Sequence, residues 1–365
     1  MTALAPAGAS SPTRESRARI PRDRPWALII LLAVLATLPF LVTPYYLGVV
    51  VLGAIYAIAV LGLYFIMGLT GQLSLAQGAF FGIGAYAAAV VSTKLDWPFW
   101  PSMGAALIAG VLVGVVLGYP VLRLTGHYLA LATIGLAIIA TIVFQQWTPV
   151  TGGPNGISGI KPPTIGSLVL SQNFYYFYLV WVFLVVLAAI AWVIKGSRVG
   201  RAFLAIREDQ LAAAATGINT LNFKVLAFTL STTYGAISGA LYAHGLTHYI
   251  SPDTFVFDLS VTMLVMLLLG GQATVPGSIL GAVLVTALPE GLRFLGQWYL
   301  VVYGVAVVLL VIFLPEGIWG WAQSAADWRR SNRRRDRGPV PMNDRPGDPS
   351  PAERGSDPTV EGRPV

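Results

Sequence analysis

The chain alternates between long apolar runs and short polar connections. A helix that crosses a lipid bilayer needs about 20 mostly apolar residues. Such runs predict ten spans, near residues 27–43, 45–68, 73–92, 99–119, 127–147, 174–194, 223–246, 257–271, 276–292 and 298–314. The runs at 73–92 and 257–271 are the candidates for re-entrant or broken helices. The pattern therefore predicts an all-α integral membrane protein, a compact bundle of about ten transmembrane or broken helices.

Basic residues favour one orientation of this bundle. Arginines crowd the stretches 14–24 and 329–337, so an even number of spans would place both termini on the same side. The connection 195–222 then falls on that side with four more basic residues, whereas the opposite connections hold only Lys94, Lys161 and Arg293. Basic connections mark the cytoplasmic side. Both termini are therefore expected in the cytoplasm.

Composition supports a membrane protein. The 365 residues are 56% hydrophobic and 11% charged, whereas an average soluble domain is about 25% charged. There is no cysteine, and the three histidines lie far apart, so no metal or other cofactor is expected on this chain. The net charge of +7 is explained by arginines that flank apolar spans beside the lipid headgroups. We therefore expect contact with membrane lipid and no nucleic-acid partner.

These patterns divide the chain into three parts. Residues 1–26 form a basic tail, residues 27–320 form the transmembrane domain, and residues 321–365 form a second tail, first basic and then rich in Pro and Gly. The tails have too little apolar surface to fold and are predicted to be disordered. The run 27–43 is expected to be a retained helix, because PFLVTPYY follows it rather than a small-residue cleavage site.

The stretch GLTGQLSLAQGAFFGIGAYAAA, residues 68–89, puts glycines and amides among apolar residues. Irregular backbone at membrane depth is tolerated only where protein or water satisfies it, and transporters place substrate groups at broken helices. Gln72, Ser74 and Gln77 are therefore candidates for a translocation pathway. The alternative is that these side chains lie at the membrane interface or bond to neighbouring helices.

Glycines recur four residues apart inside several runs. Gly78 and Gly82 form one such pair, and Gly235 and Gly239 form another. Small residues at this spacing let helix backbones approach closely in lipid. These four glycines are predicted to serve helix packing.

The connection GSRVGRAFLAIREDQLAAAATGI, residues 196–218, has the composition of a helix. Many alanines and no proline predict one helix from Arg201 to Thr216, with Gly217 placed to end it and the charged group 207–209 in its middle. Such a helix is either a lever for a soluble partner or an interfacial helix on the headgroups. On the opposite side, TGGPNGISGI at 151–160 predicts a turn, where a delivery protein could dock.

The chain has few residues that could couple transport to ATP or to an ion gradient. No GxxxxGK[ST] phosphate loop is present. Ionisable residues inside spans are functional candidates, and only Glu290 and Asp258 qualify, each near the end of a span. An ion-coupled transporter would depend on one of them, and a membrane enzyme would need a catalytic cluster that the sequence lacks.

Six sequence blocks occur in the order of a known family and cover about residues 45–320: GLTGQLSLAQGAFFGIGAY, TGGPNGISGI, GRAFLAIREDQLAAAATGIN, FKVLAFTLSTTYGAISGALYA, SPDTFVFDLSVTMLVMLLLGG and FLPEGIWG. Together they resemble the LivM-type permease subunit of branched-chain amino acid ABC importers. The resemblance implies a non-catalytic subunit in a bacterial inner membrane that forms half of the pathway for Leu, Ile and Val. Its implied partners are a second homologous permease, two cytoplasmic ATPases and an external substrate-binding protein.

The resemblance also assigns the segment 196–218 as a coupling helix that contacts an ATPase. The implied coupling residues are Gly200, Arg201, Arg207, Glu208, Asp209, Ala212, Ala213 and Gly217. Importers share an EAAxxxG pattern there, and Leu211 occupies the position of its glutamate. A second departure is Ala273, which replaces a glycine of the GGxGT pattern. Related permeases carry urea or short amides, and these substrates remain the alternative to branched-chain amino acids.

Overall fold

The computed structural model describes residues 43–165, 168–169, 173–298, 301–305, 308–309 and 317–321, with single positions between 29 and 40. The tails predicted at 1–26 and 321–365 lie outside the described residues, apart from Trp321. So does most of the predicted span 27–43 and part of the span 298–314.

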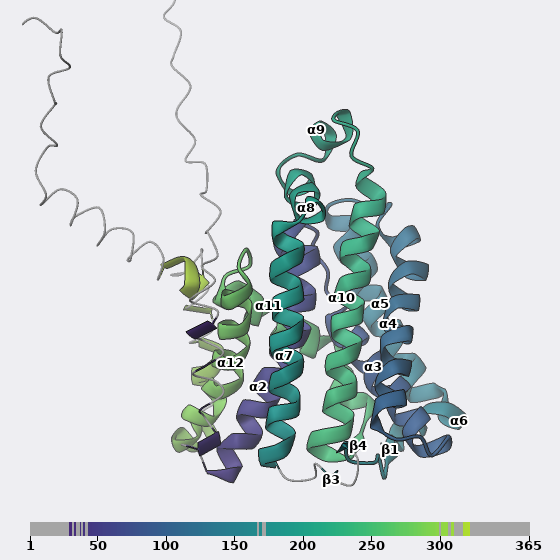
Figure 1. Cartoon of the computed structure of the whole chain (residues 1–365), viewed down its shortest axis with the longest axis vertical. Coiled ribbons are helices and arrows are strands. Elements are labelled where there is room, and N and C mark those ends of the chain that lie inside the picture. Colours follow the sequence, from purple (N-terminus) through teal and green to yellow (C-terminus); the bar gives the residue numbers. More distant parts are fainter. Residues whose placement is uncertain are drawn as a thin grey trace, which may run out of the picture. The chain divides into compact units, whose positions relative to one another are not determined.

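The described residues form a bundle of α-helices (Figure 1). The long elements are α2 (Pro44–Leu63), α3 (Gln77–Lys94), α4 (Phe99–Val121), α5 (His127–Gln146), α7 (Asn173–Gly196), α10 (Thr220–Tyr242), α11 (Phe257–Gly270) and α12 (Val275–Gly291). Shorter helices are α6 (Thr148–Thr151), α8 (Arg198–Glu208) and α9 (Gln210–Ala215), with 3-10 turns η2 (Gly153–Asn155), η4 (Pro252–Phe255) and η5 (Arg293–Trp298). Two π-helical turns, η1 (Tyr64–Leu69) and η3 (Ala243–Thr247), extend α2 and α10.

Eight of the predicted spans coincide with these long helices. The segments Tyr45–Leu69, Phe99–Val121, His127–Gln146 and Phe174–Gly196 are long and apolar enough to cross a membrane, and α11 and α12 are shorter apolar helices. The prediction of an all-α membrane protein is confirmed.

Burial separates the centre of the bundle from its outer face. α10 packs against α2, α3 and α4, while α2 also packs against α7 and α12. Most of α2 and α3 is buried, whereas α4 and α5 expose large apolar side chains such as Leu112 and Ile139. An apolar side chain that faces outward is favourable in lipid rather than in water. The exposed faces of α4 and α5 therefore suit a membrane environment rather than water.

The two ends of the bundle differ in structure (Figure 1). One end carries α8 and α9. The other carries α6 and a short antiparallel pairing of β1 (Ile157–Ser158) with β4 (Tyr249–Ile250), and a second pairing joins β2 (Thr164–Ile165) to β3 (Leu168–Val169). The stretch 151–160 adopts positive φ at its four glycines. Only glycine enters this region without strain, so the predicted turn is confirmed.

Candidate functional site

The segment 196–218 forms two helices rather than one. α8 ends at Glu208, Asp209 is extended with φ −155° and ψ 113°, and α9 starts at Gln210. The Asp209 carboxylate accepts hydrogen bonds from Leu211 N at 2.8 Å and Ala212 N at 3.0 Å. The prediction of a single helix was wrong, because an aspartate stabilises a helix start more than a helix interior.

α8 is attached to the end of α7. The Ser197 hydroxyl caps α8 by accepting from Val199 N and Gly200 N. A Cβ on Gly200 would lie 2.3 Å from the Lys195 carbonyl oxygen, so only glycine permits this turn. Phe203 is completely buried and Ile206 nearly so. One face of α8 therefore belongs to the core of the bundle.

A set of contacts ties α8 and the end of α7 to two other connections at the same end of the bundle. We call it the junction: Gly68, Lys195, Arg207, Gln272 and Ala273. The Arg207 guanidinium donates to the carbonyl of Gly68, in the π-helical turn η1. Lys195 Nζ donates to the carbonyl of Ala273 at 3.0 Å. A Cβ on Gly68 would lie 2.1 Å from the Gln272 carbonyl oxygen. The junction thus joins α8 to the end of α2 through Arg207, and the end of α7 to the turn between α11 and α12 through Lys195.

The second helix, α9, is more exposed than α8. Leu211 is 83% exposed, while Ala213 faces inward and is buried. Lys224 Nζ, at the start of α10, donates to Gln210 Oε1 at 2.6 Å. Gly217 follows α9 with φ +87°, and Ile218 N donates to the Ala213 carbonyl. These bonds have the pattern of a glycine C-terminal cap, as the sequence predicted.

The remaining predicted coupling residues lie on the surface. Arg201 is exposed and donates to the Gly196 carbonyl at 3.3 Å. Glu208 and Ala212 are exposed as well. The predicted set therefore divides into residues that hold the segment in place, such as Gly200 and Arg207, and residues available to another protein.

The three predicted pathway residues occupy different environments. Gln72 is half-buried and donates to the Thr70 carbonyl. Ser74 is buried, and its hydroxyl has no hydrogen-bond partner among the described residues. Both lie in the non-helical segment 71–76, between η1 and α3.

Gln77, by contrast, is completely enclosed. Its Nε2 donates to the carbonyls of Ala59 in α2 at 2.8 Å and of Ser231 in α10 at 3.3 Å. The Ser231 hydroxyl donates to Gln77 Oε1 at 2.9 Å. This amide therefore links α2, α3 and α10 and faces helices rather than an open channel.

The four predicted packing glycines all lie where another chain segment approaches closely. A Cβ would lie 2.9 Å from Ser260 Oγ at Gly78, and 2.7 Å from the Phe144 ring at Gly82. At Gly235 it would lie 3.0 Å from Phe80 Cβ, and at Gly239 it would lie 1.8 Å from the Phe81 carbonyl oxygen. The backbones of α3 and α10 thus touch where Gly239 lies.

Sequence reasoning missed the partners of several of these groups. Ser231 is 154 positions from Gln77, and no local pattern connects them. Sequence reasoning also missed a polar cluster between the start of α2 and the end of α12. The Tyr45 hydroxyl donates to Glu290 at 3.0 Å, and Arg293 lies 3.5 Å from the same carboxylate. Glu290 is thus paired, Asp258 is exposed, and the buried polar side chains of the described residues include no carboxylate.

Comparison with known proteins identifies the family of this chain. Residues 45–314 match the family described as "Branched-chain amino acid transport system / permease component". The chain belongs to this family. As a member of the branched-chain permease family, it is a multi-pass membrane protein and a non-catalytic transport subunit.

Individual relatives of this chain are also transport permeases. The chain is 34% identical to the high-affinity branched-chain amino acid transport system permease protein LivM of Salmonella typhimurium, over 80% of this chain and 74% of that protein. It is 26% identical to the permease protein LivH of the same organism, over 74% and 93%. It is also 25% identical to the ribose import permease protein RbsC of Haemophilus influenzae, over 80% and 92%. No solved structure matched the chain.

Proposed function

We propose that this chain is a permease subunit of an ATP-binding cassette importer of branched-chain amino acids. It forms half of the translocation pathway and transmits the motion of an ATPase through α8 and α9. LivM and LivH, which match this chain over most of its length, are named for branched-chain amino acid transport. RbsC is named for ribose import, so the fold alone does not select the substrate.

The observation that carries the coupling role is the junction. An ATPase that moves the exposed helix α9 displaces Asp209 and then Arg207, which holds the carbonyl of Gly68. Lys195, at the end of α7 and three residues before α8, links the same end of the bundle to the turn at Ala273. One surface segment thus acts on α2, α7 and α11 together, as a lever for a partner requires.

The proposed partners follow from what the chain lacks and from its relatives. Without a phosphate loop of its own, the chain depends on two cytoplasmic ATPase subunits to hydrolyse ATP. LivM and LivH are both similar to it, which supports a second, homologous permease in the complex. An external binding protein delivers the substrate, and the basic α8–α9 end, like both termini, faces the cytoplasm of a bacterial cell.

Within the pathway, we assign Gln72 and Ser74 to the lining, because they lie in the non-helical segment 71–76. Gln77 serves the pathway indirectly, by fixing α2, α3 and α10 relative to one another. The lining carries few charges, which suits an amino acid that passes through while the external protein supplies the affinity.

Leucine uptake into vesicles tests the proposal. The chain is reconstituted with the second permease, the ATPases and the binding protein that its host produces, and uptake is measured with ATP or with an ion gradient alone. We expect uptake that needs both ATP and the binding protein. Uptake by this chain alone, driven by a gradient, would refute the importer assignment.

Two arginine variants separate coupling from folding in the same assay. Arg207→Ala removes the bond to Gly68 and should lower uptake at least about fivefold, the lower end of typical coupling effects. Arg123→Ala is the control, because Arg123 is exposed in the connection between α4 and α5, outside the segment 196–218, and it should retain uptake. ATP hydrolysis stimulated by the binding protein without leucine uptake would retain the importer class and move the substrate to urea or a short amide.

A further inference from the structure

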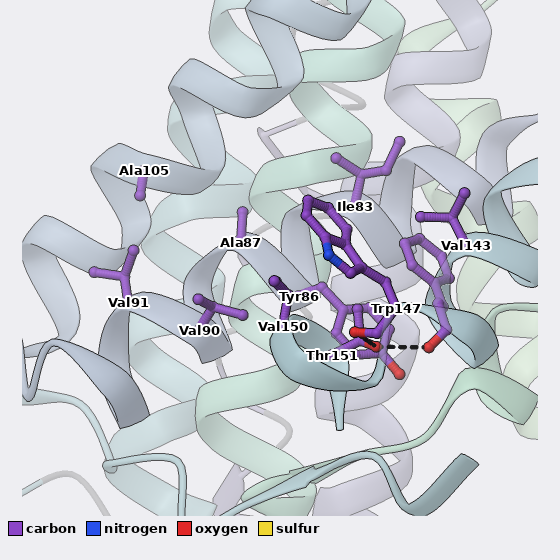
Figure 2. A pocket seen from close by; sticks show the side chains of 11 residues that line it. Ile83, Tyr86, Ala87, Val90, Val91, Ala105, Val143, Trp147, Val150 and Thr151 are labelled. Carbon is purple, nitrogen blue, oxygen red and sulfur yellow. Dashed lines mark hydrogen bonds between the residues drawn. The ribbon is translucent and has the colours of Figure 1, made fainter. Parts of the chain in front are cut away.

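A groove of about 390 Å³ lies on the side of the bundle that carries α4 and α5 (Figure 2). α3 forms its floor, and α4, α5 and α6 form its rim. The lining residues are Ile83, Tyr86, Ala87, Val90, Val91, Ala105, Val143, Phe144, Trp147, Val150 and Thr151. The groove is separate from the junction and from the segment 71–76.

The lining presents carbon almost everywhere. The Thr151 hydroxyl is already used, because it donates to the carbonyl of Phe144 at 2.8 Å and accepts from Gly153 N. The Tyr86 hydroxyl has no partner among the described residues, but one hydroxyl cannot satisfy both charges of an amino acid. A zwitterion left without hydrogen bonds in such surroundings is strongly disfavoured. The groove therefore suits an apolar chain rather than the transported substrate.

The length of the groove matches a lipid tail. Its floor runs along α3 from Ile83 to Val91, and eight residues of helix rise about 12 Å. One leaflet of the hydrocarbon core is roughly 15 Å thick, half of the usual 30 Å. The rim helices α4 and α5 carry exposed apolar residues such as Leu112 and Ile139 on their outer faces. A chain that enters the groove from the bilayer thus replaces contacts with other lipid tails.

The end of the groove next to α6 has features that are typical of the lipid headgroup region of a bilayer. Trp147 is 56% exposed there, and tryptophan is enriched at membrane interfaces. Lys94 follows Val91 on α3, is exposed, and donates from Nζ to the carbonyl of Pro149, the neighbour of Val150. Among the described residues, no carboxylate pairs with this ammonium. Its charge is available to a phosphate at the mouth of the groove.

We propose that this groove binds one phospholipid, with an acyl chain along α3 from Ile83 to Val91 and the headgroup phosphate at Lys94. The bound lipid fills the space between α4 and α5 and steadies the outer wall of the bundle. An anionic lipid is favoured over a zwitterionic one, because Lys94 adds a positive charge and the carboxylate nearest to it in sequence, Asp96, pairs with Lys161 at 2.7 Å. This inference rests on the membrane location and does not depend on which substrate is carried.

Photolabelling of the assembled transporter tests the proposal. The full complex is placed in bilayers with phosphatidylglycerol that carries a photoactivatable diazirine on one acyl chain, and labelled peptides are quantified by mass spectrometry. We expect peptides 83–91 and 143–151 to be labelled at least about fivefold more than the α4 surface around Leu112. Equal labelling of groove and surface would mean ordinary surrounding lipid only, and an unlabelled groove would mean that another protein covers it. Either result overturns the proposal.

Two pairs of variants locate the tail and the headgroup. Ala87→Trp fills the floor and should remove most of the labelling in the groove, whereas Ile139→Trp, on the exposed face of α5, should not. Lys94→Gln should lower labelling by phosphatidylglycerol more than labelling by phosphatidylcholine. The control Arg293→Gln changes an exposed basic residue that pairs with Glu290 at 3.5 Å, away from the groove lining, and should leave both unchanged. Equal effects of Lys94→Gln and Arg293→Gln would overturn the headgroup assignment. Lys94 is exposed, so Lys94→Gln does not disturb the core.

Discussion

Replacement of Gly239 by alanine tests the contact between α3 and α10 most directly. The added Cβ would lie 1.8 Å from the Phe81 carbonyl oxygen and 2.9 Å from Ala85 N, both backbone atoms. Since a Cβ essentially never lies closer than 3.0 Å to another atom, the two helices must separate by about 1.2 Å at this point. The Ser231–Gln77 hydrogen bond, on the same pair of helices, is 2.9 Å long. The same displacement would lengthen and weaken it.

The energy follows from these displacements. Overpacking costs about 1–3 kcal/mol, and loss of an interhelical hydrogen bond in a membrane costs about 0.6 kcal/mol. The higher helix propensity of alanine offsets up to about 1 kcal/mol of this loss of stability. The net loss of stability is therefore about 1–3 kcal/mol for Gly239→Ala.

A matched glycine elsewhere isolates the packing effect. Gly135 in α5 has no atom within 4 Å of an added Cβ, so Gly135→Ala should be neutral or stabilising by up to about 1 kcal/mol. The apparent unfolding temperatures of both purified variants are compared in nanodiscs at one heating rate. If Gly239→Ala unfolds at the temperature of Gly135→Ala, the close contact between α3 and α10 does not stabilise the bundle, and the reasoning is wrong.

Three further predictions concern polar groups. Gln77→Leu should destabilise the protein by about 1–3 kcal/mol, because the Ser231 hydroxyl loses its partner in the core. Thermal unfolding measures this change. A loss of stability no larger than that of Gln72→Leu would contradict the prediction. Asp209→Ala should cost α9 about 1 kcal/mol as its cap is lost, with faster amide exchange at 211–212, while Asp209→Asn should exchange like the wild type. Lys224→Met should speed amide exchange across 210–215 without affecting α8, and unchanged exchange would show that the bond to Gln210 does not hold α9.

The sequence predicted what is local and periodic. Apolar runs predicted the long helices, and glycine spacing predicted close backbone approach at Gly78 and Gly239, although not which segments approach. The break at Asp209 was missed because the high helix propensity of the alanines that follow obscured a competing cap. The junction bond between Arg207 and Gly68 joins positions 139 apart. Such a contact depends on the packing of α7 against α2, which no local pattern specifies.

The contact between α3 and α10 determines how this protein can move. Two helices whose backbones touch cannot bend separately, so α3 and α10 move together, along with α2 and α4, which also pack against α10. α10 has 23 residues and is therefore an arm about 34 Å long. A tilt of only about 5° at the end next to α9 moves the opposite end by about 3 Å, which is enough to open or close a passage the width of a side chain. Such a tilt needs no helix to unfold, because the left-handed Gly217 separates α9 from α10.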